Sequence, residues 1–156
     1  MGLTVPDLDA AVRWYSEVFG WELVMGPVDV TTDDPRVVDQ VRDVFGAPTV
    51  VFRQAHMRAG DSTGVELFEF FEPHRTVGRA AFRYWTPGPF HLCVVEPAID
   101  EQADRIERAG GKRCSAVRAI FSGEPFRFCY CQDPFGNVIE IASHPHAEVF
   151  GGRDAY

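Results

Sequence analysis

Hydrophobic residues follow two different spacings along this chain, and the spacings alternate in a repeating order. Apolar positions recur every three or four residues over 8–19 and 99–109, a period typical of helices with one buried face. Between them lie short runs rich in β-branched and aromatic residues, which predict strands at 1–5, 21–25, 49–56, 65–71, 90–95, 112–117, 126–132 and 138–143. The order of one strand, one helix and three strands occurs twice, which indicates an internal duplication.

The duplication predicts an α+β fold made of two βαβββ repeats. We expect a single domain over 1–156, with a first module at 1–72 and a second at 89–143. An amphipathic stretch at 35–45 predicts a helix inserted into the first module, and residues from 144 onward are expected to form a tail. Each module supplies one mixed sheet with a helix on its back, so we expect a concave cleft between the sheets.

Composition and charge narrow the classes of partner. The formal net charge is −8, which disfavours nucleic acid and anionic membranes because both attract basic surfaces. No apolar run reaches the roughly 18–20 residues of a membrane span, and no basic, apolar leader is visible, so we expect a cytoplasmic protein. The cysteines are expected to be apolar filler in a reducing compartment: Cys93, Cys114, Cys129 and Cys131.

A turn and the strand after it carry the strongest chemical signal. Asp133-Pro134 begins a tight turn, which the pair Gly136-Asn137 can close. Glu140 lies in the middle of the following apolar strand, where an uncompensated carboxylate is costly. Because Ile139 and Ile141 should pack on a helix, strand alternation points Glu140 toward the cleft. A bound cation is one way to compensate its charge.

Two further residues are expected beside Glu140. In the corresponding strand of the first module, Glu66 takes the place of Glu140, although alignment on Pro73 would favour Glu69 instead. His91 begins the strand at 90–95 and lies at the same end of the cleft. One histidine and two carboxylates from three strands suit a divalent metal with open coordination positions.

Several segments together resemble one known superfamily. They are Gly2-Leu3-Thr4-Val5-Pro6-Asp7, Val65-Glu66-Leu67-Phe68-Glu69, Phe90-His91-Leu92 and Asp133-Pro134-Phe135-Gly136-Asn137-Val138-Ile139-Glu140. On these segments the chain resembles the vicinal oxygen chelate superfamily, which includes glyoxalase I, methylmalonyl-CoA epimerase, extradiol dioxygenases, and fosfomycin and bleomycin resistance proteins. The resemblance covers nearly the whole chain and is more specific for the fold than for the reaction.

The resemblance implies metal ligands at four places, two in each module. Three of them correspond to Glu66, His91 and Glu140, which would bind Ni, Zn, Co, Mn or Fe. The fourth would be a histidine that opens the first strand, and superposing the repeats puts it just before Met1. Either the chain start is assigned late or this member lacks that ligand, which His144 or His146 could replace.

Two functions remain as hypotheses. The first is a glyoxalase-like, metal-dependent isomerase or lyase that stabilises an enediolate, with Glu66 or Glu140 as the general base. The second is a non-catalytic small-molecule or antibiotic-binding resistance protein that uses an aromatic cleft of Phe52, Phe68, Phe70, Phe128 and Tyr130. The resemblance implies a small-molecule ligand and a homodimer in both cases.

Overall fold

Each half of the chain folds around its own mixed sheet. The two units are Met1–Gly78 and Arg79–Tyr156, and the computed structural model describes residues 1–31, 35–46, 51–60, 62–72, 84–85 and 87–152. The connection predicted at 72–88 therefore lies largely outside the described residues. The α+β class that the sequence predicts, with two mixed sheets, is confirmed.

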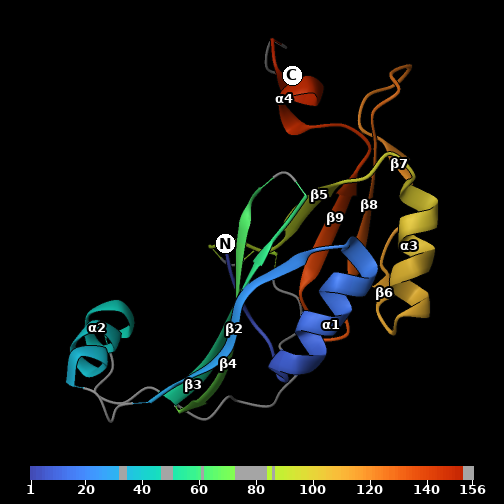
Figure 1. Cartoon of the computed structure of the whole chain (residues 1–156). Helices are drawn as coiled ribbons and strands as arrows, with labels where there is room; N and C mark the ends of the chain where they lie inside the picture. Colours follow the sequence, from blue (N-terminus) through green and yellow to red (C-terminus); the bar gives the residue numbers. More distant parts are fainter. Residues whose placement is uncertain (32–34, 47–50, 61, 73–83, 86, 153–156) are drawn as a thin grey trace. The chain divides into compact units, whose positions relative to one another are not determined.

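The first unit places its sheet strands in the order β1-β4-β3-β2, and Figure 1 labels β2, β3 and β4 among them. Strand β1 runs parallel to β4, and the other neighbouring pairs are antiparallel. In chain order the elements are β1 (Gly2–Thr4), α1 (Leu8–Phe19), β2 (Glu22–Val30), α2 (Pro35–Phe45), β3 (Val51–Arg58) and β4 (Gly64–Glu72).

Helix α1 packs its apolar stripe on one face of this sheet. The Asp7 side chain accepts a hydrogen bond from the Ala10 N–H at the first turn, and Gly20 ends the helix with a φ of 68°. The predicted stripe is confirmed for Leu8, Ala11, Tyr15 and Val18, all of which are buried. Across from it, every second strand residue is buried: Ala55, Met57, Val65 and Leu67.

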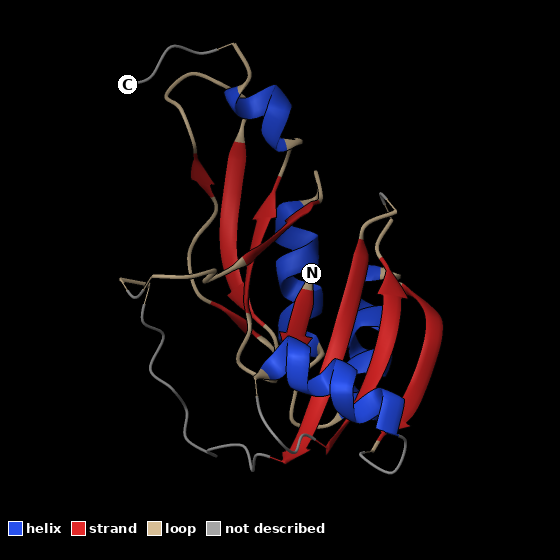
Figure 2. Ribbon diagram, turned by 90° about the vertical axis from the view of Figure 1, so that its left-hand side faces the viewer, coloured by secondary structure: helices blue, strands red, loops and turns tan. Residues whose placement is uncertain are grey.

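Helix α2 lies on the other face of the same sheet, opposite α1 (Figure 2). It has the bounds that the sequence predicts for the inserted helix, 35–45. Val37 and Val41 of α2 pack against three aromatic strand residues, Phe52, Phe68 and Phe70. These aromatic side chains, which the sequence assigns to a ligand cleft, therefore form a core beneath α2.

Strand β2 is longer than the sequence predicts. The predicted strand covers 21–25. The strand instead continues to Val30, with two shifts in its register against β3 between Leu23 and Val28. A Cβ on Gly26 would lie 2.6 Å from the Gln54 carbonyl oxygen, so this close approach of two strands requires glycine.

The second unit repeats the strand order of the first as β5-β9-β8-β6, with β7 also paired to β8. Its elements are β5 (Leu92–Val95), α3 (Ile99–Arg108), β6 (Lys112–Arg113), β7 (Arg118–Ala119), β8 (Arg127–Gln132), β9 (Val138–Ala142) and α4 (His146–Phe150). Strand β5 is parallel to β9, as β1 is to β4. Among the described helices of the whole chain, none is long and apolar enough to cross a membrane.

Helix α3 covers one face of the second sheet. Its buried residues include Ile99, Ala103 and Ile106, and the sheet presents Ile139, Ile141, Cys129 and Cys131 on its side as buried residues. Burial raises the pKa of the Cys131 thiol to about 12, so it stays protonated. Cys129 and Cys131 therefore serve as apolar filler, as expected.

The strand predicted at 112–117 is much shorter in the structure. The ladder stops after Arg113, because the backbone N–H groups of Cys114 and Ser115 both donate to the Tyr130 carbonyl. The Ser115 hydroxyl then accepts the Tyr130 N–H at 2.9 Å. A side chain thus replaces a backbone partner, which ends regular pairing.

The predicted tail contains a short helix. Helix α4 follows Pro145, and its Val149 is buried although neighbouring residues are exposed. Phe150 packs edge-on against Phe121, with ring centres 5.9 Å apart. Val149 and Phe150 therefore pack α4 against the rest of the second unit. The helix is too short to show helical periodicity in the sequence.

A buried carboxylate organises the predicted turn between β8 and β9. Asp133 is 4% exposed. Its Oδ1 accepts the N–H groups of Phe135 and Asn137 at 2.9 and 2.7 Å, and its Oδ2 accepts the Asn137 side-chain amide at 2.8 Å. Gly136 closes the turn with a φ of 104°. The turn sets the register of the hairpin. Gln132 pairs with Val138, and the pairs further from the turn follow from that one.

We expect Asp133→Ala to destabilise the protein by about 2 to 3 kcal/mol, because buried N–H groups lose a charged acceptor. Chemical denaturation, followed by circular dichroism, measures this loss. Asp133→Asn keeps one acceptor oxygen for the two backbone amides and should lose clearly less. Wild-type stability in Asp133→Ala would contradict the role given to this carboxylate.

Candidate functional site: an imidazole and a carboxylate on each sheet

Glu140 lies on the face of the second sheet that α3 does not cover. Its strand neighbours Ile139 and Ile141 are buried on the helix side, as the alternation predicts. Across the sheet its backbone pairs with Cys93 of β5 and Tyr130 of β8. Glu140 therefore has a potential side-chain partner on each neighbouring strand.

Two groups contact the same oxygen of Glu140. His91, the residue just before β5, places its Nε2 3.0 Å from Glu140 Oε2. The Tyr130 hydroxyl donates a hydrogen bond to that oxygen at 3.2 Å. The His91 and Tyr130 rings also meet edge to face, with centres 5.5 Å apart. The structure thus brings together two of the three predicted ligands, His91 and Glu140.

One ring nitrogen of His91 is buried without a hydrogen-bond partner. Its Nδ1 is buried and has no hydrogen-bond partner among the described residues. The His91 and Glu140 side chains are 25% and 20% exposed, so solvent or a ligand can still reach the pair. A half-buried imidazole and carboxylate in contact can exchange a proton or share a cation.

The Glu140 carboxylate affects the acidity of its neighbours. Burial, together with the Glu140 charge and hydrogen bond, raises the pKa of Tyr130 to about 12. Burial and the same charge raise the pKa of Cys93 to about 11. Tyr130 therefore remains a hydrogen-bond donor at neutral pH, and Cys93 remains a thiol rather than a nucleophilic thiolate.

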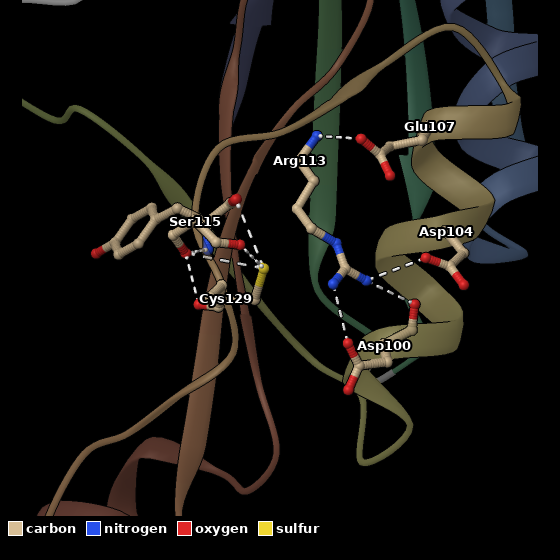
Figure 3. Close-up of polar contacts among 8 residues, drawn as sticks. Asp100, Asp104, Glu107, Arg113, Ser115 and Cys129 are labelled. Atoms are coloured by element: carbon tan, nitrogen blue, oxygen red, sulfur yellow. Dashed lines mark hydrogen bonds and ion pairs between the residues drawn. The ribbon is translucent and has the colours of Figure 1, made fainter.

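Contacts behind the sheet fix the backbone of Tyr130. Strand β6 is anchored on α3 through Arg113, whose guanidinium binds the side chains of Asp100 and Asp104 at 2.9 and 3.1 Å (Figure 3). Two residues further on, Ser115 accepts the Tyr130 N–H. Figure 3 shows Arg113 beside α3 and Ser115 beside Cys129. Tyr130 is thereby held in the position from which it reaches Glu140.

In the first unit the structure separates the two candidate glutamates. Glu66 lies on the face away from α1, where its Oε1 is 3.6 Å from His56 Nδ1. Glu69 lies on the α1 side, 16% exposed, and accepts the Leu8 N–H at the helix start. Arg53 also reaches Glu69, at 3.5 Å. Glu69 is thus engaged in holding α1, and Glu66 lies on the opposite face, whose aromatic residues α2 covers.

The two units use the same register around their glutamates. In the first unit, Glu66 pairs with Gly2 on the parallel strand and with His56 on the antiparallel strand. In the second unit, Glu140 pairs in the same way with Cys93 and Tyr130. In this register Cys93 is equivalent to Gly2, which agrees with the superposition of the repeats in the sequence analysis. The position equivalent to His91 therefore precedes Met1.

Each unit presents donors that suit a divalent cation, one imidazole and one carboxylate. Their chemistry fits the nitrogen and oxygen ligands of Ni, Zn, Co, Mn or Fe. No group of three or more histidine, cysteine, aspartate or glutamate side chains is placed to hold a metal ion within the part of the chain that the structure describes. His144 contacts Ser143, 2.7 Å from its hydroxyl, and His146 is exposed on α4.

A separate hollow of about 550 Å³ lies at the start of α3 in the second unit. Arg127, Ser143 and His144 line one side of it, and the first turn of α3 lines another. None of its lining residues is His91, Tyr130 or Glu140. The imidazole–carboxylate pair therefore does not belong to this hollow.

The sequence interpretation missed three neighbours of the glutamates. It treated Tyr130 as part of an aromatic cleft and Cys93 as filler, and it gave His56 no role. Counting outward from the two hairpin turns would have found two of them, because His56 faces Glu66 and Tyr130 faces Glu140 in regular antiparallel register. The contact between Cys93 and Glu140 depends on parallel pairing, which no local turn reveals.

A family model described as Glyoxalase/Bleomycin resistance protein/Dioxygenase superfamily matches residues 1–141. A curated relative, the 2-epi-5-epi-valiolone epimerase of an Actinomyces species, is 29% identical over 150 residues, which is 94% of this chain and 79% of the relative.

Two solved structures share the fold. A glyoxalase family protein from Bacillus cereus matches with a TM-score of 0.74 and 21% identity, over 91% of this chain and 89% of that one. A mutant of the genomically encoded fosfomycin resistance protein from Listeria monocytogenes, solved with Mn(II) and a dihydroxypropylphosphonic acid, matches with a TM-score of 0.55 and 13% identity, over 96% and 93%.

We expect the Tyr130 phenol of the metal-free protein to ionise near pH 12 rather than near 10. Since the folded state keeps a proton that the unfolded chain loses, the resulting stability is complete below pH 10 and disappears as the pH rises through about 12. Absorbance titration of the tyrosinate band, compared between wild type and Tyr130→Phe, measures this step.

Two variants test the cause of that shift. Glu140→Gln removes the charge and should move the Tyr130 step to lower pH, whereas Tyr84→Phe, an exposed tyrosine, should leave the step in place. If wild type and Tyr130→Phe titrate identically above pH 11, the Tyr130–Glu140 contact is wrong.

Proposed function

Because the chain belongs to the Glyoxalase/Bleomycin resistance protein/Dioxygenase superfamily, we propose that it is a metal-dependent isomerase or lyase acting on a small molecule next to a carbonyl group. The observation that carries this proposal is the contact of His91 and Tyr130 with one oxygen of Glu140 on an open sheet face. The relative named as an epimerase supports an isomerase-type reaction.

We propose Glu66, His91 and Glu140 as ligands of a divalent cation, Ni, Zn, Co, Mn or Fe. A cation bound by these residues would act as a Lewis acid toward the carbonyl oxygen of the substrate. His91 offers an imidazole nitrogen, and the contacts of His91 and Tyr130 with Glu140 are both made to Oε2, which leaves Oε1 for a cation. The glutamates supply the negative charge that favours binding of a cation.

Glu66 or Glu140 would act as the general base. The carboxylate takes the proton from the carbon next to the carbonyl, which leaves an enediolate and a carboxylic acid. Return of the proton to the other face of that carbon inverts it, whereas return to the neighbouring carbon moves the carbonyl. Tyr130, protonated at neutral pH, orients Glu140 through its hydrogen bond.

A hydroxylated ketone is the substrate class that we favour. The name of the Actinomyces relative denotes a ketone and a reaction that inverts a stereocentre, and both agree with proton transfer next to a carbonyl. We also propose a homodimer in the cytoplasm, an expectation from the family that light scattering and cell fractionation can check.

Elemental mass spectrometry on the purified protein tests metal binding. We expect about one Ni, Zn, Co, Mn or Fe per chain, and a loss of most of it in Glu140→Ala and His91→Ala because each removes a ligand. The matched control is Glu148→Ala, an exposed glutamate on α4. Absence of metal in wild type, even after loading, would leave the non-catalytic binding protein as the better hypothesis.

Incorporation of solvent deuterium next to the carbonyl of hydroxyketone substrates, followed by NMR, tests the reaction itself. Glu140→Gln should slow the exchange by a factor of about 10² or more, as expected for loss of a general base or its partner. Exchange at the wild-type rate in Glu140→Gln would remove Glu140 from the mechanism. Metal binding without exchange on any ketone tested would contradict the isomerase assignment.

A further inference from the structure

His56 has a position in the first unit that no sequence motif indicated. It lies on β3, directly across from Glu66 on β4, and both side chains share the face away from α1. The other strand neighbour of Glu66 is Gly2, which has no side chain to offer. Among the strand neighbours of Glu66, the only side chain that carries a nitrogen donor is therefore that of His56.

Neither ring nitrogen of His56 makes a hydrogen bond among the described residues. Nε2 is buried and has no partner there, and Nδ1 lies 3.6 Å from Glu66 Oε1, beyond the range of a hydrogen bond. Nδ1 faces Glu66 and is therefore the ring nitrogen that an ion beside Glu66 would bind. The His56 side chain is 33% exposed, so a small ligand can reach it.

The distance between the two donors suits a shared cation better than a direct contact. Two ligands that each lie about 2.1 Å from a tetrahedral cation are about 3.4 Å from each other. The Nδ1–Oε1 distance of 3.6 Å is close to that value, whereas His91 and Glu140 approach to 3.0 Å. The His56–Glu66 pair is thus already spaced as two ligands of one ion.

We propose that His56 is a further ligand of the cation that Glu66 is proposed to bind, with Nδ1 as the ligating atom. The inference rests on the proposed function, because it adds a residue to the same cation. His56 supplies an imidazole from the third strand of the first unit. At the same register position of the second unit, Tyr130 supplies a hydrogen-bond donor instead.

The test is a zinc titration of the metal-free protein, followed by long-range ¹H–¹⁵N NMR of the histidine rings, which distinguishes Nδ1 from Nε2. We expect Nδ1 of His56 to shift together with a ring nitrogen of His91, while His146 on α4 stays unchanged. The signal is assigned by its loss in His56→Gln. A structural role alone would not move the His56 nitrogen.

Zinc affinity measured by calorimetry gives a second readout. His56→Gln should bind zinc at least about 10-fold more weakly than wild type, and Glu148→Gln, which changes an exposed glutamate on α4, should bind as wild type does. If His56→Gln does not fold, Glu66→Gln replaces it, and the zinc-dependent shift of His56 should then weaken.

The outcomes separate the two proposals. A shift at His91 without a shift at His56, together with unchanged affinity in His56→Gln, overturns this inference and leaves the proposed function intact. No zinc-dependent shift at either histidine and no binding by calorimetry overturns both. A shift of His56 that persists unchanged in Glu66→Gln contradicts shared ligation by the pair.

Discussion

The register of the β8–β9 hairpin is the constraint on which the second-unit site depends. A buried carboxylate, Asp133, holds the turn with three hydrogen bonds, and the pairing from Gln132 and Val138 outward follows from it. A shift by one residue would turn Glu140 toward α3 and expose Ile139 and Ile141. Burial of those isoleucines and hydrogen bonding of the turn therefore favour the same arrangement, which leaves the carboxylate on the open face.

The duplicated fold keeps this register in both units while the side chains have diverged. Each glutamate has one neighbour on a parallel strand and one on an antiparallel strand. In the second unit those neighbours are Cys93 and Tyr130, and burial keeps both protonated. In the first unit they are Gly2 and His56. The backbone thus provides two equivalent positions, and the residues at them determine which side chain lies beside each glutamate.

The two faces of the first sheet differ in what covers them and in the contacts of their charged residues. On the α1 side, Glu69 accepts the first helical N–H, and Arg53 binds both Glu69 and Asp9. On the other side, α2 covers the aromatic residues around Phe52. Glu66 lies on that second face beside His56. The inserted helix consequently covers aromatic surface that the sequence assigns to a ligand cleft.

The sequence by itself determined the α+β class, the duplication, the inserted helix and the outward direction of Glu140, because these depend on local period, turn residues and strand alternation. The sequence did not predict helix α4, because five residues are too few to show a helical period. The strand predicted at 112–117 is shorter in the structure, because the Ser115 side chain replaces a backbone partner. Only the tertiary structure decided that Glu69 binds the N-terminus of α1 and that His56 lies beside Glu66. It also decided that Tyr130 and His91 contact one oxygen of Glu140. Those contacts join strands through pairing and side-chain reach, which no single stretch of sequence encodes.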